Sequence, residues 1–181
     1  MPLYFIAIVA PPFVNEQALK QKQYMFNEYG CKVALRSPAH ITLVPPFNTS
    51  ASNEAQMHEA LASVSIQHSA FDIEITNYNY FAPRVIYLDV KKSTQLEQLK
   101  IDVEDAMLKA ALPIKKETRP YHPHITIANR DLERKDFHAV KKHFDSQQYN
   151  AIFLADNVSI LRSEREGWKV IDTIKLQDTS T

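Results

Sequence analysis

The chain contains one tetrapeptide twice, as HITL at residues 40–43 and as HITI at residues 124–127. Each copy follows closely after a proline, Pro38 or Pro123, and its apolar, β-branched composition predicts a strand. Residues two apart on a strand share a face. In each copy, therefore, a histidine and a threonine project together, while the aliphatic residues beside them point into a core.

The two copies divide the chain into similar halves that mix strands and helices. This pattern predicts an α+β fold of two lobes packed about a pseudo-twofold axis. If the lobes face each other, two imidazoles and two hydroxyls converge on one cleft. No Ser/Gly-rich linker or long charge block interrupts the interior, so residues 1–181 are predicted to form a single domain of two intertwined lobes.

Apolar periodicity and turn residues predict the elements of both halves. Asn15 and Thr94 are predicted N-caps, and Gly30 is predicted to end the first helix. Pro45 and Pro46 are expected to begin a loop, because proline cannot donate to a sheet ladder. The predicted strands cover residues 3–10, 33–35, 39–44, 71–75, 85–90, 123–128, 151–154, 158–161 and 170–176, and the predicted helices cover residues 15–28, 53–66, 94–112 and 132–144.

Composition excludes several classes of protein. The 21 basic and 21 acidic residues cancel, which argues against binding to duplex DNA or to an anionic membrane. With only two glycines, Gly30 and Gly167, no glycine-rich phosphate loop can form. The single cysteine, Cys31, excludes an internal disulfide and a multi-cysteine zinc site. The apolar run at residues 3–13 is too short to span a bilayer, and we expect a cytoplasmic monomer.

Two histidines and two threonines that face one cleft suit phosphoester chemistry. A neutral imidazole can take a proton from water and a protonated one can give a proton to a departing alkoxide, each worth roughly 10²–10⁴-fold in rate. Threonine hydroxyls can donate to non-bridging phosphate oxygens. A single His-x-Thr on a strand is more often structural. Two copies arise by chance roughly once in twenty such chains, and the shared strand context lowers that chance further.

The segments around the repeated motif resemble those of the 2H phosphoesterases, the superfamily that includes 2′-5′ RNA ligase-like proteins and cyclic nucleotide phosphodiesterases. The two motif strands of that family are similar to AHITLVPPF (residues 39–47) and RPYHPHITIANR (residues 119–130). Its opening strand, the strand between its motifs and its final hairpin are similar to LYFIAIVAPP (3–12), PRVIYLDV (83–90) and ILRSEREGWKVIDTIKL (160–176).

The resemblance implies a bilobal α+β fold, with two antiparallel-sheet lobes and outer helices around a central cleft. It also implies metal-independent hydrolysis of a 2′,3′-cyclic phosphate or related phosphodiester to a 2′-phosphate, with no cofactor. Carried over by position, His40 and His124 are the catalytic acid and base, and Thr42 and Thr126 bind the phosphate. The sequence leaves open which histidine is the acid.

Other residues near the motifs are weaker candidates. Arg130, Phe47 and Tyr121 are predicted to bind substrate, since arginine can pair with a phosphate and aromatic rings can stack on a base. His122 is interpreted as a structural neighbour of His124. Further positive charge could come from Arg36, Arg84, Lys115, Lys116 and Arg119, an aromatic wall could come from Phe81, and His58, His68, His138 and His143 are interpreted as surface or helix-end residues.

We therefore expect an enzyme whose partner is a small cyclic nucleotide or an RNA terminus with a cyclic phosphate. Two alternatives stay open at this point. One is ligation of 2′-5′ RNA ends by the same fold, and the other is a nucleotide- or RNA-binding module without turnover. A metal-dependent hydrolase fits less well, because no further ligand lies at metal-binding spacing around either motif.

Overall fold

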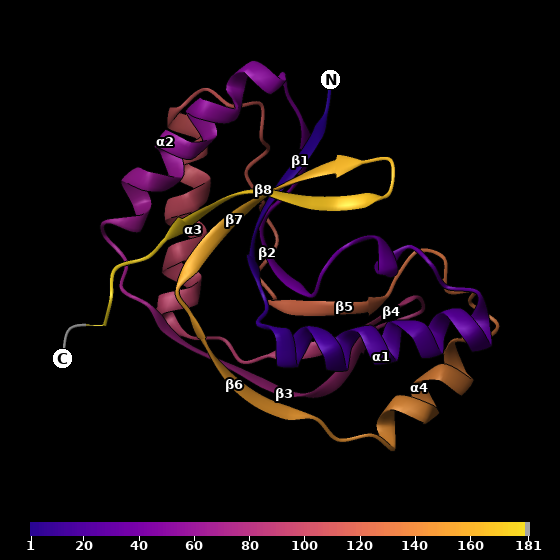
Figure 1. Cartoon of the computed structure of the whole chain (residues 1–181). Coiled ribbons are helices and arrows are strands. Elements are labelled where there is room, and N and C mark those ends of the chain that lie inside the picture. The colour runs from indigo at the N-terminus through magenta and orange to yellow at the C-terminus, as the bar shows by residue number, and fades with distance from the viewer. Residues whose placement is uncertain (180–181) are drawn as a thin grey trace.

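Figure 1 shows the computed structural model, which describes residues 1–179. Its framework is two four-stranded antiparallel sheets with helices on their outer sides. The first sheet has the order β2-β1-β7-β8, formed by Leu3–Val9 (β1), His40–Asn48 (β2), Asn157–Glu164 (β7) and Gly167–Lys175 (β8). The second has the order β5-β4-β3-β6, formed by Phe71–Phe81 (β3), Val85–Val90 (β4), His124–Ala128 (β5) and Asn150–Ala155 (β6).

The helices are α1 (Pro12–Tyr29), α2 (Glu54–Ser65), α3 (Thr94–Lys109) and α4 (Phe137–Asp145), with short 3₁₀ turns η1 (Ala34–Arg36) and η2 (Ala51–Asn53).

Two helices cross from the sheet that precedes them to the opposite sheet. α1 follows β1 of the first sheet but packs on β5 of the second, and α3 follows β4 of the second sheet but packs on β2 of the first (Figure 1). α2 lies beside α3 and contacts β7 and β8, whereas α4 contacts β3. This exchange ties the two sheets together and holds the motif strands β2 and β5 in contact. Within residues 1–179, no helix has the length and apolar composition needed to cross a membrane.

The first strand is apolar throughout because both of its faces are buried. Tyr4, Ile6 and Ile8 belong to the main core, whereas Phe5 packs with Leu161 in a smaller cluster on the opposite face. All five side chains are at most 3% exposed. Burying a large apolar side chain contributes about 1.5–3 kcal/mol, so both faces of β1 stabilise the fold. The smaller cluster lies on the side of the sheet that carries the first motif histidine.

The second strand is longer than the sequence predicts. β2 continues through Pro45 and Pro46 to Asn48, instead of ending at Val44. It is the outer strand of its sheet and pairs with β1, so a proline that lacks an N–H can be accommodated on its free side. The register between β1 and β2 shifts twice within residues 4–7 of β1. The prolines thus form part of a strand wall, and the expected loop at this point is wrong.

Two predicted helix caps are also wrong. α1 begins directly after Pro11 and has Pro12 in its first turn, because proline already has the backbone angle that a helix needs there. Asn15 lies inside the helix, and its Oδ1 accepts from the Ala39 amide at 2.8 Å. For α3 the cap is Ser93, whose hydroxyl accepts from a backbone amide in the first turn. The predicted glycine end of α1 is confirmed, since Gly30 has φ 70°.

A contact between the lobes explains two other differences. The Asp131 carboxylate accepts hydrogen bonds from the amides of Lys32 and Val33 at 2.6 and 2.8 Å. These amides are therefore not free to pair in a sheet, and the predicted strand at residues 33–35 is replaced by the 3₁₀ turn η1. Asp131 itself lies in a turn, so α4 begins at Phe137, five residues later than predicted.

Candidate active site

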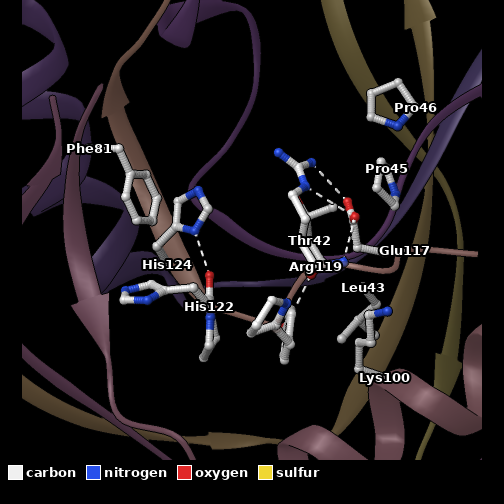
Figure 2. Close-up of a pocket in the computed structure, with 13 residues that line it drawn as sticks. Thr42, Leu43, Pro45, Pro46, Phe81, Lys100, Glu117, Arg119, His122 and His124 are labelled. Carbon is white, nitrogen blue, oxygen red and sulfur yellow. Dashed lines mark hydrogen bonds and ion pairs between the residues drawn. The ribbon is translucent and has the colours of Figure 1, made fainter. Parts of the chain in front are cut away.

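The two motif histidines occupy equivalent positions at the start of their strands. His40 is the first residue of β2, and His124 is the first residue of β5. In each ring Nδ1 lies 2.7 Å from the backbone carbonyl oxygen two residues earlier, that of Pro38 or of His122. A carbonyl oxygen can only accept, so Nδ1 carries the proton in both rings. Nε2 is therefore the nitrogen left to act on a ligand, as Figure 2 shows for His124.

Each imidazole packs against an aromatic ring of the neighbouring strand. The ring of His40 lies 4.6 Å from that of Phe5 on β1, and Trp168 on β8 packs edge-on against Phe5 at 4.5 Å. The ring of His124 lies 5.1 Å from that of Tyr87 on β4. The aromatic contacts and the Nδ1 hydrogen bonds together restrict the orientation of both histidines.

Burial disfavours the protonated form of both histidines. It lowers the pKa of His40 to about 4, and it also lowers the pKa of His124. The two rings are close enough that the charge of His124 contributes to the lowered pKa of His40. Both imidazoles are therefore neutral at pH 7 in the free protein. An anionic ligand between them would raise both pKa values, because a negative charge favours the protonated ring.

The motif threonines follow their histidines on the same strand faces. Thr42 of the first sheet lines a cavity together with His124 of the second, so the two motifs meet there. Tyr121 joins the lobes at this point, since its hydroxyl donates to the Thr42 carbonyl oxygen at 3.0 Å. Within residues 1–179 neither His40 nor Thr126 lines this cavity, which therefore opens mainly on the His124 side.

The cavity that adjoins His124 has a volume of about 590 Å³ (Figure 2). Ligand pockets typically measure about 300–1,000 Å³ and combine apolar walls with a few polar groups. This cavity has that character, since its lining combines prolines and the rings of Phe81 and Tyr121 with charged groups from α3 and the loop after it. Its lining residues are Thr42, Leu43, Pro45, Pro46, Phe81, Lys100, Glu117, Arg119, Pro120, Tyr121, His122, Pro123 and His124.

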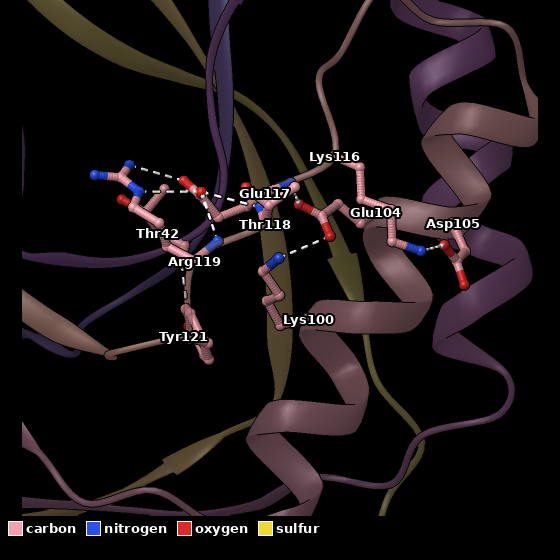
Figure 3. Close-up of polar contacts among 9 residues, drawn as sticks. All are labelled: Thr42, Lys100, Glu104, Asp105, Lys116, Glu117, Thr118, Arg119 and Tyr121. Carbon is pink, nitrogen blue, oxygen red and sulfur yellow. Dashed lines mark hydrogen bonds and ion pairs between the residues drawn. The ribbon is translucent and has the colours of Figure 1, made fainter.

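The loop over the cavity is anchored by a buried ion pair (Figure 3). Lys100 and Glu104 on α3 are 2.7 Å apart, and their side chains are only 9% and 2% exposed. Glu104 also accepts from the backbone amide of Glu117 at 3.0 Å. The Glu117 carboxylate in turn accepts from the Arg119 guanidinium at 3.1 and 2.9 Å, and this contact lowers the pKa of Glu117 to about 2. Arg119 is thus held at the mouth of the cavity while its side chain stays 84% exposed.

Comparison with known proteins identifies the family of this site. The model of the 2′-5′ RNA ligase superfamily matches residues 11–167, a range that includes both histidine motifs. The chain belongs to the 2′-5′ RNA ligase superfamily. The resemblance to 2H phosphoesterases seen in the sequence is thereby confirmed.

One relative supports this membership, and two solved structures share the fold. An RNA 2′,3′-cyclic phosphodiesterase of Bacillus subtilis is 33% identical over 139 residues, which cover 71% of this chain and 72% of the relative. A crystal structure of TT0787 from Thermus thermophilus superposes with a TM-score of 0.71 at 18% identity, over 99% of this chain and 100% of that one. E. coli LigT in complex with 3′-AMP gives a TM-score of 0.71 at 20% identity, over 97% and 99% of the two chains. The predicted bilobal α+β fold is confirmed.

The substrate-binding residues suggested by the sequence are only partly brought together in this member of the superfamily. Tyr121 lines the cavity. Phe47 is 6% exposed and packs in the core with its ring 6.3 Å from that of Tyr4. Arg130 is exposed beyond the end of β5, and its carbonyl oxygen accepts from Arg84 at 3.4 Å. Neither Phe47 nor Arg130 is among the described residues that line the cavity.

His122 supports the second histidine through both its main chain and its side chain. Its carbonyl oxygen holds Nδ1 of His124. Its own Nε2 lies 3.2 Å from the Tyr87 hydroxyl and 3.2 Å from Oδ1 of Asp89. The ring also lies on the cavity wall, where Phe81 packs edge-on against it at 5.0 Å. The interpretation of His122 as a structural neighbour of His124 agrees with these contacts.

The remaining basic residues and histidines of interest lie elsewhere. Arg36 donates to the carbonyl oxygen of Glu164, away from the cavity next to His124. Lys116 pairs with Asp105, and Lys115 lines a neighbouring cavity. The helix-associated histidines have local partners: His58 with Asp172, His68 with Asp102, and His143 stacked on Tyr24.

Sequence reasoning missed several residues that surround the histidines. Phe5 and Trp168 support His40, but β1 is apolar on both faces and gives no signal of which residue faces the site. Tyr87 and Asp89 could have been found, because they are two apart on β4 and Asp89 is the one charged residue of an otherwise uncharged strand. Within the part of the chain that the structure describes, no cluster of three His, Cys, Asp or Glu side chains is arranged to hold a metal ion.

Proposed function

We propose that this chain hydrolyses a 2′,3′-cyclic phosphate, on a small nucleotide or at an RNA end, to a 2′-phosphate by metal-independent two-histidine catalysis. The observation that carries the proposal is the matching geometry of the two motifs. His40 and His124 each donate from Nδ1 to a carbonyl oxygen at 2.7 Å, which leaves two Nε2 atoms for one substrate. The homology to an RNA 2′,3′-cyclic phosphodiesterase supports the same substrate class.

The reaction needs one proton taken and one proton given. The Nε2 lone pair of one histidine removes a proton from a water molecule, whose oxygen forms the new bond to phosphorus. The P–O3′ bond breaks, and the protonated Nε2 of the other histidine donates its proton to the departing O3′. The product is a nucleoside 2′-phosphate, and the two histidines have exchanged protonation states, which solvent then restores.

The surrounding residues supply binding and charge stabilisation. In this proposal the hydroxyls of Thr42 and Thr126 donate to non-bridging phosphate oxygens. The cavity beside His124 offers Phe81 and Tyr121 as aromatic surfaces for a base. A nucleotide-sized ligand is also supported by the related E. coli LigT, which has been crystallised with 3′-AMP, NADP⁺ and ATP.

The proposal is tested by incubating the protein with uridine 2′,3′-cyclic phosphate and with an RNA oligomer that ends in a cyclic phosphate, both in EDTA. Phosphorus NMR identifies the products, since a 2′-phosphate, a 3′-phosphate and a new 2′-5′ linkage give different resonances. We expect the 2′-phosphate from at least one substrate. A new linkage as the main product would establish the ligase alternative, and binding without turnover would establish the binding module.

The control for this experiment is His138→Ala, a substitution of an exposed histidine on α4. It should leave the product and its rate unchanged, whereas His40→Ala and His124→Ala should abolish the signal. A 2′-phosphate that forms only after a divalent metal ion is added would contradict the proposed metal independence.

A further inference from the structure

A buried lysine lines a cavity near the first motif. Lys22 on α1 is 3% exposed, and its Nζ donates to the carbonyl oxygen of Ser37 at 2.9 Å. Among residues 1–179 no carboxylate forms an ion pair with it, and burial lowers its pKa to about 8. A buried ammonium group without a counter-ion costs stability, so packing alone is a poor reason for a lysine at this position. An ammonium group has three donors, and the bond to Ser37 leaves two of them for a ligand.

The cavity that Lys22 lines measures about 430 Å³, and within the described part of the chain it shares no lining residue with the cavity beside His124. Its walls are α1, the segment that precedes β2 and the hairpin of β7 and β8. The Arg36 guanidinium holds the hairpin against that segment by donating to the carbonyl oxygen of Glu164 at 3.2 Å. A Cβ at Gly167 would lie only 2.5 Å from the carbonyl oxygen of Arg36. Because only glycine permits this approach, the cavity is a built feature of the fold.

Donors from two elements line this cavity. Asn15 on α1 accepts from the Ala39 amide through Oδ1 at 2.8 Å, which leaves its Nδ2 as a donor. The side chain of Arg36 lines the cavity as well, and it bonds the hairpin carbonyl oxygens through Nη2 alone. Together with Lys22, these side chains offer N–H groups from several directions, as a phosphate group requires.

The charges around the cavity favour an anion. Its charged lining residues are three cations, Lys22, Arg36 and Lys169, and two carboxylates, Glu164 and Glu166. The Glu164 carboxylate is already paired with an arginine of β7 at 2.8 Å, and Glu166 is exposed at the tip of the hairpin. A bound anion would therefore supply the charge partner that the buried ammonium of Lys22 lacks.

The cavity borders the His40 side of the site. Pro38 lines it, and the Pro38 carbonyl oxygen holds Nδ1 of His40 at 2.7 Å. Trp168 lines it too and packs edge-on against Phe5, whose ring lies 4.6 Å from that of His40. Lys22 is near enough for its charge to contribute to the lowered pKa of His40. Each of the two motif histidines thus has a cavity beside it.

We propose that the cavity around Lys22 binds the phosphate group on O5′ of the nucleotide whose cyclic phosphate lies between the two histidines, an inference that rests on the proposed function. In a ribose the base leaves from C1′, next to C2′, and the 5′ carbon leaves from C4′, next to C3′. A nucleotide held by its 2′,3′-cyclic phosphate therefore extends its base to one side and its 5′-phosphate to the other. The base occupies the cavity beside His124, and the 5′-phosphate meets Lys22.

This second phosphate site selects among cyclic phosphates. In RNA, the phosphate on O5′ of the last nucleotide is the phosphodiester that links it to the rest of the strand. An RNA end and a 5′-phosphorylated nucleotide both carry this group, whereas a nucleoside 2′,3′-cyclic phosphate lacks it. The Lys22 cavity therefore favours the first two ligands over the third.

The first test compares the binding of uridine 2′-monophosphate and uridine 2′,5′-bisphosphate by isothermal titration calorimetry at pH 7, which needs no turnover. The two ligands differ only in the 5′-phosphate. In the wild-type protein the bisphosphate should bind about 10- to 100-fold more tightly, because its added phosphate forms charge-assisted hydrogen bonds. Equal affinities would overturn the proposal.

Substitutions locate the added affinity. Lys22→Met should bring the ratio of the two dissociation constants close to one, and taking the ratio cancels any general effect of the substitution on the site. The matched control is Lys20→Met, an exposed lysine on the same helix, which should retain the wild-type ratio. A wild-type ratio in folded Lys22→Met would show that the added phosphate binds elsewhere. If Lys22→Met does not fold, the exposed Lys169→Gln decides, because the ratio then falls a few-fold or the proposal is wrong.

Fluorescence of Trp168, the one tryptophan in the chain, distinguishes a nucleotide phosphate from free phosphate. The bisphosphate should change its emission at concentrations that match the calorimetric dissociation constant, and an unchanged emission would place the added phosphate elsewhere and overturn the proposal. A response to inorganic phosphate, combined with equal affinities for the two nucleotides, would identify a separate site for free phosphate and overturn it as well. Failure of the proposed function would show separately, as the absence of product from any cyclic phosphate while the bisphosphate keeps its advantage in binding.

Discussion

The segments that end in His40 and His124 have the same local structure in different surroundings. Both histidines open a strand, and both donate from Nδ1 to a carbonyl oxygen at 2.7 Å. His40, however, has Phe5 and a buried lysine as neighbours, while His124 has Tyr87 and a carboxylate nearby. In both segments the backbone just before the motif holds Nδ1 of the histidine, whereas burial and the charged neighbours of each ring determine how readily it is protonated.

Removal of either histidine ring should have the largest effect on activity. His40→Ala and His124→Ala should each lower kcat/KM for a cyclic-phosphate RNA end by roughly 10²–10⁴-fold, because each removes one of the two proton transfers. The kcat/KM of the double variant should be only slightly lower than that of the less active single variant, because the two groups act in one step. Steady-state kinetics on the three variants, with His138→Ala as control, check this. Multiplicative losses in the double variant would indicate that the rings act independently.

A second prediction concerns stability at low pH. The pKa of His40 is about 4 in the folded protein and about 6.5 in an unfolded chain, so the unfolded state binds more protons between these values. Stability should therefore fall as the pH is lowered from 6.5 to 4, by about 1.4 kcal/mol for each pKa unit. His40→Asn keeps a donor for the Pro38 carbonyl oxygen but cannot titrate, and it should lose less stability over this range.

Urea unfolding at pH 7.0, 5.5 and 4.5 measures this effect in the wild type and in His40→Asn. The exposed His138→Asn is the matched control and should follow the wild type. If the free energy of unfolding falls equally in the wild type and in His40→Asn as the pH is lowered, the fold does not hold His40 in its neutral form.

Substitution of either motif threonine should have a smaller effect than substitution of a histidine. Thr42→Val and Thr126→Val each remove one hydroxyl that can donate to a charged phosphate oxygen, and such a hydrogen bond is worth about 1.5–3 kcal/mol. We expect kcat/KM to fall about 10- to 100-fold in each variant, with KM raised more in Thr42→Val because Thr42 also lines the cavity. Thr118→Val, in the exposed part of the neighbouring loop, should be neutral. Wild-type kinetics in both motif variants would exclude a role in phosphate binding.

The smallest expected effect is at the contact that joins the lobes over the cavity. Tyr121→Phe removes the hydroxyl that donates to the Thr42 carbonyl oxygen at 3.0 Å. The free energy of unfolding should fall by about 1 kcal/mol, and KM should rise a few-fold as the cavity wall loosens. Tyr149→Phe serves as a control, because Tyr149 is not among the described residues that line the cavity. A Tyr121→Phe variant with unchanged melting and unchanged KM would show that this hydrogen bond contributes nothing to the site.

Much of the fold could be predicted from local patterns. The alternation in the motif strands correctly placed His40 with Thr42 and His124 with Thr126, because a strand has a period of two whatever it packs against. The apolar run of β1 and the glycine at the end of α1 were equally local signals. Such features follow from a few neighbouring residues, which the sequence contains.

The structure differs from the sequence-based predictions where residues distant in the sequence determine the local structure. Asp131 accepts hydrogen bonds from the amides of Lys32 and Val33, so residues 33–35 do not form a strand. Asn15 accepts a hydrogen bond from the Ala39 amide instead of capping its own helix. The exchange of α1 and α3 between the sheets has no local signal at all. Lys22 illustrates the same limit in the site, since a lysine on a helix is usually solvated and only the packing of α1 shows that it is buried beside His40.

Whether both motif histidines present Nε2 to one phosphate can be measured by ¹⁵N NMR of the imidazole nitrogens. Spectra would be recorded at pH 7 without ligand and with uridine 2′-monophosphate, the proposed product. We expect Nδ1 to carry the proton in both His40 and His124, and we expect the Nε2 resonance of both rings to shift when the nucleotide binds. A ring protonated at Nε2 in the free protein, or a nucleotide that shifts only one of the two rings, would contradict it.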